Sequence, residues 1–464
     1  MNPKTHERAS RPALVLGLAA MAAILVAGNA AALASDGLRA AVFAVDASPP
    51  IGSPMAYNPT LEVQLPLSCR GVVLAGAGDP IVLCAVDWIG IGNDGQVEFR
   101  RALADATGTS PDRVRVHTLH QHDAPHCDFS ADRLLAEQGI NGEVFDSGFN
   151  RRVIARAAEA VRSAMKATRP VTHLGLGEAE VDKVASTRRI LGPDGKVQHV
   201  RYTACKDPKV RDMPVGTIDP KLKMISLWDG DAPIVALTYY ATHPQSYYLT
   251  GKANPDFPGM ARDARQAATG VPHVHFNGAG GDIGAGKYND GSHAMRQVLA
   301  DRVASGMERA WKATRKTPIA AGDVAWRAVP VTLPPAPHLD EAKLVATLRD
   351  RSAKLTERSR AANDLAWLRR CKAGETIDVS CLHLGPARIL HLPGELFVEY
   401  QLAAQKLRPG LFVAMAAYGD YAPGYIGTEV AYSQGGYETA PTSSLVAPGV
   451  ERVLMDAIGR LLRD

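Results

Sequence analysis

The sequence lacks the features that assign many proteins to a class at first sight. Its formal net charge is only +4 over 464 residues, and no basic stripe is interleaved with aromatic residues, so nothing indicates nucleic-acid binding. It has no Cys-x-x-Cys pair, which argues against a zinc site built from thiolates. It also has no internal repeat, no low-complexity segment and no composition shift that would mark a linker. What remains, 46% hydrophobic and 22% charged residues, is the composition of a globular protein with a hydrophobic core.

Only one long hydrophobic run is present, and it lies at the N-terminus. Three basic residues within the first eleven positions precede an apolar run over residues 13–26. Ala32-Leu33-Ala34 then fits the small-x-small rule for cleavage before Ser35. We therefore expect a signal peptide over residues 1–34 and a protein that is exported, periplasmic or secreted. The alternative is an uncleaved anchor, because the uncharged run over residues 12–35 is long enough to span a bilayer.

If the protein is exported, its six cysteines could form disulfides, because an exported chain with an even number of cysteines allows them. Cys371 and Cys381 bracket a short polar loop and are the candidate pair. The other four cysteines are left unassigned: Cys69, Cys84, Cys127 and Cys205.

Predicted strands and helices alternate along the chain, which indicates an α/β or α+β protein with sheets covered by helices. Residues 148–167 have apolar side chains at helical spacing and predict a helix. Residues 379–392 are interpreted as one long strand. Residues 186–221 are rich in Arg, Lys, Asp, Pro and Gly and are predicted to be a long loop, a kind of segment that is usually functional or disordered.

Four histidines fall within ten residues, at positions 117, 120, 122 and 126, directly after a strand-like stretch. Imidazole is the commonest metal-ligating side chain. His120 and His122 are two residues apart, so on extended backbone both would point to the same side, although Pro125 places them where the strand breaks into a loop. His117 lies an odd number of steps from His120 and should face the other side. Such histidines can also have a purely structural role, in which they fill space in the core or cap the end of an element. His117 or His126 remain alternative ligands.

Further polar residues stand where predicted strands end. His243 and Glu395 each follow a strand, as do the tyrosines between Tyr418 and Tyr425. Sites built from several strand ends are typical of α/β enzymes. Two imidazoles and a carboxylate around an open position form the ligand set of a catalytic zinc.

Short motifs along nearly the whole chain resemble those of one family, the neutral (non-lysosomal) ceramidases. Each motif is short, but their order and spacing together are specific. They are Asp46-Ala-Ser-Pro-Pro-Ile-Gly52, Leu83-Cys-Ala-Val-Asp87, His120-Gln-His122-Asp-Ala-Pro125, Ala241-Thr-His243, Asn277-Gly-Ala-Gly-Gly-Asp282, Pro393-Gly-Glu395, and Tyr425-Ile-Gly-Thr428 followed by Tyr437-Glu438. The resemblance implies an α/β fold with two β-sheets covered by helices, in a single catalytic domain over residues 38–464.

The resemblance also implies which residues bind a metal. One zinc ion would be bound by His120, His243, Glu395 and Tyr425, at strand ends that converge on one rim. The gap after Tyr421 is one residue longer than in the family, so Tyr421 is the alternative tyrosine ligand.

Other residues are implied to act on the substrate. His122 and Tyr437 would be unligated, would face the open position of the zinc and would polarise the scissile carbonyl. Arg188 falls where the family has an arginine that helps to bind substrate, and Asp282 lies in the substrate-contacting stretch. Gly284 stands where the family has a serine that contacts the substrate, a departure that puts ceramide itself in question. The family's full-length members also carry a C-terminal immunoglobulin-like domain. The motifs found here all belong to the catalytic domain, so we expect the catalytic domain alone.

The implied function is hydrolysis of an amide bond in an N-acyl, sphingolipid-like substrate. Zinc lowers the pKa of a bound water to roughly 7, and the resulting hydroxide attacks the carbonyl. A lipid-like substrate implies peripheral contact with a membrane surface. The alternatives are a zinc hydrolase for a different amide or ester, and a non-catalytic exported binding protein that keeps the scaffold. The presence of all four ligand types favours the enzyme, and the sequence does not predict acyl length, head group or oligomeric state.

Overall fold

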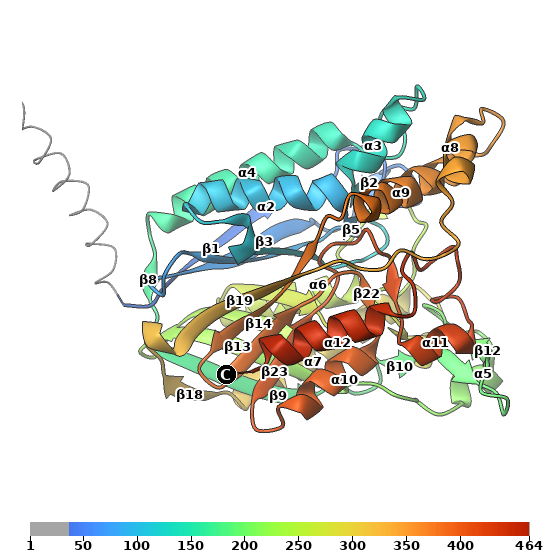
Figure 1. Ribbon diagram of the computed structural model, residues 1–464. Helices are drawn as coiled ribbons and strands as arrows, with labels where there is room; N and C mark the ends of the chain where they lie inside the picture. Colours follow the sequence, from blue (N-terminus) through green and yellow to red (C-terminus); the bar gives the residue numbers. More distant parts are fainter. Residues whose placement is uncertain (1–36, 464) are drawn as a thin grey trace, which may run out of the picture.

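Three larger β-sheets form the frame of the computed structural model, which describes residues 37–463 (Figure 1). The first sheet has the strand order β6-β4-β3-β1-β8, the second β16-β14-β13-β9-β18 and the third β19-β20-β21-β23. The strands of the first are β1 (Arg39–Asp46), β3 (Ser68–Ala75), β4 (Ile81–Val86), β6 (Val114–Thr118) and β8 (Arg169–Pro170). Those of the second are β9 (His173–Glu180), β13 (Lys221–Asp229), β14 (Ala232–Tyr240), β16 (His273–Asn277) and β18 (Arg315–Pro318). Those of the third are β19 (Val324–Val331), β20 (Ile377–Leu384), β21 (Ala387–His391) and β23 (Phe412–Ala416).

Each of these sheets contains one pair of parallel strands. The pairs are β4 with β6, β14 with β16, and β21 with β23. The parallel pair of the second sheet also contacts the other two sheets, since β16 packs against β6 of the first and β23 of the third. The carboxyl ends of the parallel strands therefore come together, which is the place where α/β folds build their sites.

Helices cover the outer faces of the sheets. In Figure 1, α2 and α4 lie over the first sheet, and α10 and α12 lie over the third. Helices α6 and α7 pack on the second sheet, and α9 contacts α3 and α8. The helices are α2 (Asn93–Thr107), α3 (Phe129–Ala136), α4 (Ser147–Met165), α5 (Pro208–Asp212), α6 (Asp256–Thr269), α7 (Ala294–Lys312), α8 (Glu341–Arg349), α9 (Leu355–Lys372), α10 (Val398–Leu407), α11 (Glu429–Gln434) and α12 (Val450–Leu461).

The core of the molecule joins all three sheets. One buried cluster contains Leu83 of the first sheet, Ile225 of the second and Ile389 of the third. Helix α4 shows why the helices cover this frame, because its buried residues Phe149, Val153 and Ala157 recur every four positions and form one apolar stripe. The helix predicted over residues 148–167 is confirmed by α4.

The α/β class, with helix-covered sheets, is confirmed, but the structure has a third large sheet where the sequence interpretation expected two. The difference arises at residues 379–392, which were interpreted as one strand and in fact form the hairpin of β20 and β21. Gly385 makes this reversal, with a φ of 53° that suits glycine. Together with β19 and β23, the hairpin forms the third sheet.

Residues 186–221 are not the featureless loop that the sequence suggested. They contain β10, β11, β12 and α5. Several such short strands pair outside the main sheets and hold the connecting segments in place. The pairs are β2 (Glu62–Val63) with β15 (Lys252–Ala253), β5 (Gly90–Ile91) with β7 (His126–Cys127), β10 (Ser186–Thr187) with β17 (Ile283–Gly284), β11 (Arg189–Leu191) with β12 (Val197–Val200), and β22 (Glu395–Leu396) with β24 (Tyr425–Ile426).

All six cysteines are free thiols in the structure, so the suggested Cys371–Cys381 pair is wrong. Cys381 lies on β20 with its side chain in the hydrophobic core, whereas Cys371 lies in the last turn of α9 at the edge of the same cluster. The polar segment between them that suggested a bridge includes the turn from a helix into a strand, which needs no cross-link.

The predicted signal peptide falls within residues 1–36 and lies outside the described residues. Among residues 37–463, none of the helices combines the length and the apolar character needed to cross a bilayer.

A buried ion pair ties the first sheet to α6. Asp87, directly after β4, accepts hydrogen bonds from Arg262 at 2.6 and 3.0 Å and from both the backbone N–H and the hydroxyl of Ser68. Both charged side chains are fully buried. Burial opposes the charge of Asp87, but Arg262 and Ser68 together hold its pKa below the usual range.

We predict that Asp87→Asn lowers the free energy of unfolding by about 3 kcal/mol, because it takes from the buried Arg262 guanidinium its one fully buried counter-charge among the described residues. Urea unfolding of purified protein measures the loss. Asp263→Asn is the matched control, since Asp263 also contacts Arg262 but is 42% exposed, and it should cost less than about 1 kcal/mol. Equal losses in the two variants would contradict the assignment.

Candidate metal centre

The candidate site is built from segments that follow the parallel strands. His120 comes two residues after β6, His243 three residues after β14, and Glu395 four residues after β21. Tyr425 lies in the segment after β23, where β24 pairs with β22 and aligns Tyr425 with Glu395. The predicted convergence of strand ends therefore occurs in the structure.

Two residues of the site adopt an unusual backbone conformation. His120 has a φ of 65° and Tyr418 a φ of 59°, in the left-handed region that non-glycine residues rarely occupy. The strand thus breaks before His120, and the side-chain alternation of an extended strand does not apply to His120 and His122. The ring of Tyr418 stacks on the His120 ring with centroids 4.6 Å apart, which fixes the imidazole in place. Strain of this kind is concentrated at functional sites.

The side-chain atoms of His120, His243, Glu395 and Tyr425 meet around one point. The Nε2 atoms of the two histidines are 3.3 Å apart. Glu395 Oε2 is 3.2 Å from Nε2 of His120 and 3.4 Å from Nε2 of His243. The hydroxyl of Tyr425 is 3.4 Å from Nε2 of His243. Apart from Tyr425, which is 6% exposed, at least 97% of each of these residues is buried.

The backbone fixes which nitrogen of each ring carries the proton. Nδ1 of His120 lies 2.6 Å from the carbonyl oxygen of Ile89, and Nδ1 of His243 lies 3.1 Å from that of Gly280. A carbonyl oxygen can only accept, so both Nδ1 atoms donate, which leaves both Nε2 atoms available to present a lone pair to a metal. This is the arrangement by which outer partners orient histidines that bind a metal.

A cation explains this arrangement of acceptors. Two Nε2 lone pairs and the carboxylate oxygen Oε2 of Glu395 face one another, and Oε2 is buried with no hydrogen-bond partner among the described residues. Without a positive charge between them, these atoms would repel one another. Ligand atoms of His120, His122 and His243 lie within 4.8 Å of one another, so the three histidines could hold a metal ion. The residues present therefore fit a metal.

His122 differs from the other two histidines because both of its ring nitrogens have protein partners. Nδ1 is 2.8 Å from the hydroxyl of Tyr57, and Nε2 contacts the side-chain amide of Gln245. Burial, and then the proximity of His120 and Arg188, hold the pKa of His122 well below its usual value, so its ring is neutral. Burial lowers the pKa of His243 in the same way.

Arg188 brings a positive charge to the edge of the centre. Its guanidinium donates to the hydroxyl of Tyr425 at 3.1 Å and forms an ion pair with Glu438 at 3.2 Å. Burial works against its charge, but Tyr425 and Glu438 hold its pKa above the usual value. Burial raises the pKa of Tyr425 well above its usual value, and the nearby Arg188 acts in the opposite direction.

The two candidate tyrosine ligands contact different partners. The hydroxyl of Tyr421 donates to Glu395 Oε1 at 3.0 Å, on the carboxylate oxygen that does not face the histidines. The hydroxyl of Tyr425 is instead the one that lies near His243 Nε2. Tyr437 packs edge-to-face on the ring of Tyr425, with centroids 5.7 Å apart, and is 43% exposed at the mouth of the site.

The glycine-rich segment after β16 lets three loops approach one another closely. A Cβ atom on Gly281 would lie 2.2 Å from the carbonyl oxygen of Glu395, and one on Gly280 would lie 2.7 Å from the backbone of Thr242. At Gly284 a Cβ atom would lie 3.3 Å from the side chain of Arg188. The side chain of Asp282 accepts a hydrogen bond from the N–H of Val398 at 2.9 Å, at the start of α10.

The other two histidines of the predicted cluster have different surroundings. His117 is buried between the carbonyl oxygen of Ala417 and the ring of His391, at 2.7 and 3.0 Å. His126 packs against the rings of Phe145 and Tyr421. Neither belongs to the group of histidines whose nitrogens meet.

Sequence reasoning missed several residues that complete the site. Tyr57 and Gln245 hold His122, Tyr418 supports His120, and Glu438 anchors Arg188. Glu438 stands in a quoted motif and Tyr418 among the tyrosines that follow a predicted strand, but their roles depend on contacts over long separations in the chain. Tyr57 lies in a loop with no motif of its own, and no signal in the sequence marks it.

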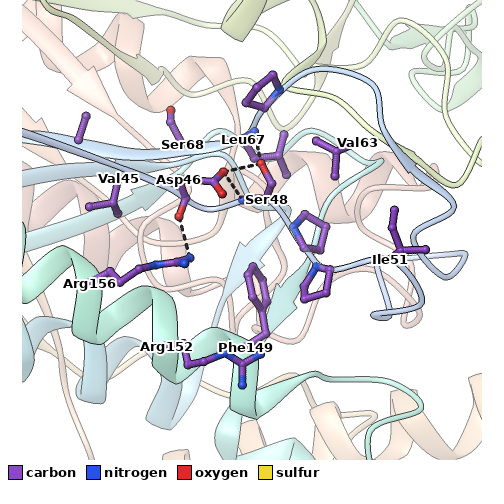
Figure 2. A pocket seen from close by; sticks show the side chains of 14 residues that line it. Val45, Asp46, Ser48, Ile51, Val63, Leu67, Ser68, Phe149, Arg152 and Arg156 are labelled. Carbon is purple, nitrogen blue, oxygen red and sulfur yellow. Dashed lines mark hydrogen bonds between the residues drawn. The ribbon is translucent and has the colours of Figure 1, made fainter.

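A second hollow lies apart from these residues. It is an open groove of about 890 Å³. In Figure 2, Arg156 of α4 points toward Asp46, whose backbone carbonyl oxygen accepts its hydrogen bond at 2.9 Å. Its lining includes none of the predicted metal ligands, so the groove is not the candidate centre.

Comparison with known proteins identifies the fold. A crystal structure of neutral ceramidase from Pseudomonas aeruginosa matches with a TM-score of 0.65 and 16% sequence identity, over 92% of this chain and 75% of that one. A structure described as ceramidase complexed with C2 matches with a TM-score of 0.66 and 14% identity, over the same shares of the two chains. No protein family matches the sequence, and no curated protein matches it. The predicted resemblance is therefore confirmed at the level of the fold.

Proposed function

We propose that this chain, which has the fold of the neutral ceramidases, is a zinc-dependent hydrolase of amide bonds in N-acyl, lipid-like substrates. The observation that carries the proposal is the set of buried ligand atoms, the Nε2 atoms of His120 and His243 and the Oε2 atom of Glu395, which lie within 3.4 Å of one another. Two imidazoles and a carboxylate are the ligands of catalytic zinc sites in hydrolases.

We assign His120, His243, Glu395 and Tyr425 as the residues that would hold the zinc. A bound zinc ion at this position would supply a Lewis acid for the carbonyl and an acidified water as the nucleophile. Tyr421 supports the carboxylate of Glu395 through its second oxygen and so keeps Oε2 directed at the histidines. The ligand types suit the borderline softness of zinc.

Three residues are assigned to the substrate. Arg188, with its charge 3.1 Å from the Tyr425 hydroxyl, places a positive potential where the carbonyl oxygen becomes negative. Tyr437 stands at the mouth of the site and can donate its hydroxyl to the same oxygen. His122 can donate an N–H once the substrate displaces the hydroxyl of Tyr57, which is on a side chain that is 47% exposed. Asp282 and Gly284 are assigned to the substrate region as well: Asp282 accepts a hydrogen bond from Val398 at the start of α10, and Gly284 lies against the side chain of Arg188.

The alternative of a non-catalytic binding protein predicts metal without turnover. We expect one zinc per chain and hydrolysis of N-acyl amides that stops when a chelator is added and resumes when zinc is restored. The measurement is elemental analysis of purified protein, followed by release of amine from a panel of ceramides and simpler N-acyl amides.

The same panel distinguishes the remaining candidates. Zinc at one per chain with no release from any amide would support the binding protein instead. Release that survives complete removal of the metal would refute the zinc mechanism, and release from esters alone would reassign the substrate bond.

A further inference from the structure

A partly open cavity of about 450 Å³ adjoins the metal centre. It shares two of its walls with that centre, since Tyr57 and Tyr421 line it. Tyr57 contacts His122 and Tyr421 contacts Glu395, each through its hydroxyl. The metal centre and the cavity are therefore neighbours that share these two tyrosines.

The far wall of the cavity comes from helix α9. Thr356, Ser359, Asn363 and Asp364 line it from successive turns of that helix. A long alkyl chain would need an apolar tunnel, whereas this wall presents hydroxyls, an amide and a carboxylate. Met55, Val144 and Leu445 line other parts of the cavity, so it is matched to a short alkyl chain that ends in a compact polar group.

Two of the free polar groups in the cavity are acceptors, whereas the free hydroxyl of Ser443 can donate or accept. The Asp364 carboxylate has no hydrogen-bond or ion-pair partner within the described structure, and the buried Oδ1 of Asn363 also has none. By contrast, the other buried carboxylate, Asp128, is fully used, because it accepts from the N–H groups of Ser130 and Ala131 and from the amide of Asn93. A ligand that fits must bring donors.

The charges point to the same kind of ligand. Arg360 and Glu143 line the cavity with opposite charges and are both exposed, so they offset one another at the rim. The ionisable groups of the interior, Asp128 and Asp364, are both carboxyls. Burial raises the pKa of the Asp364 carboxyl to about 7, although Arg360 one turn earlier acts in the opposite direction. This carboxyl lacks a close cation, and an ammonium group would supply one together with three N–H donors.

We propose that this cavity binds a protonated amine carried by the substrate next to the amide that is cleaved, with Asp364 as the residue that selects it. The proposal rests on the amidase function proposed above and narrows its substrates to amides with a second, cationic amine on a short chain. Asp364 is in this view a specificity residue and takes no part in the chemistry at the metal.

The test compares two amides of the same acyl group, monoacylated diaminobutane, which is cationic, and the neutral pentylamide of equal length. We expect wild-type zinc enzyme to favour the cationic amide in kcat/KM by about 10-fold or more, the factor that corresponds to a hydrogen bond between charged groups. Asp364→Asn should reduce the ratio of the two kcat/KM values by about the same factor. Glu357→Gln is the matched control, because it removes an acid from the exposed side of the same helix and should preserve the ratio.

The outcomes separate this proposal from the proposed function. Cleavage of both amides with equal kcat/KM, or an unchanged ratio in Asp364→Asn, overturns the assignment of the cavity and leaves the amidase standing. If no amide is cleaved, the amidase is refuted. Titration calorimetry with diaminobutane alone then tests whether the cavity binds a cation. Saturable binding that weakens about 10-fold in Asp364→Asn would then support a cation site, and no difference between the two proteins would overturn it.

Discussion

Replacing His120 by alanine should remove both the metal and the activity. His120 contributes an Nε2 lone pair that faces His243 and Glu395, and its Nδ1 is already committed to the carbonyl oxygen of Ile89. Loss of an outer partner of a metal ligand typically costs about 10–100-fold in metal affinity, so loss of a ligand should cost more than about 100-fold. The measurement is zinc per chain after dialysis, together with amide hydrolysis by the same preparation.

His126→Ala is the matched control for the metal content. This residue lies in the same histidine-rich segment, is partly exposed and packs on the ring of Tyr421 without reaching the other histidines. It should keep zinc at the wild-type level. Zinc retained in His120→Ala and lost in His126→Ala would show that the ligand assignment within this segment is wrong.

Replacing His122 by alanine should have the opposite pattern, in which the metal stays and catalysis is lost. Both ring nitrogens of His122 are taken up by Tyr57 and Gln245, so the ring is held as a neutral group beside the acceptor cluster. A donor that acts on the developing oxyanion affects the rate more than the affinity for substrate. We expect kcat to fall by about 10²–10³, the usual cost of losing one such donor.

Steady-state kinetics and zinc content of His122→Ala test this assignment. Full zinc occupancy with a much lower kcat supports a donor. Loss of the zinc in His122→Ala would instead make it a ligand, in agreement with the alternative group of three histidines that the geometry also permits. Comparison with His120→Ala then decides which pair of imidazoles binds the ion.

Much of the candidate site can be predicted from the sequence because its residues are placed by local structure. A strand that ends in a short loop determines where the next side chains stand, and His120, His243 and Glu395 each follow a predicted strand. Parallel strands in α/β proteins bring such positions to one rim. The order of the short motifs along the chain is also a property of sequence alone, and it led to the fold that the structural comparison confirms.

Features that depend on a single turn or on distant contacts were not predictable. Gly385 converts an apparently continuous strand into a hairpin, because a glycine with positive φ reverses the chain where hydrophobic patterning alone gives no break. Cys371 and Cys381 are close in sequence, yet one lies on a helix and the other on a strand, and neither is bonded. Closeness along the chain does not set the distance between two side chains.

The sequence by itself determined the class of fold, the strand ends that carry polar residues and the types of side chain available for a metal. These follow from periodicity and residue chemistry, which act over a few residues. The tertiary structure alone decided that Tyr57 and Gln245 hold His122, that Glu438 anchors Arg188, and that Asp364 faces a cavity behind Tyr421. Those contacts join segments that are far apart in the chain, and their geometry is set by the packing of three sheets against one another rather than by any local preference.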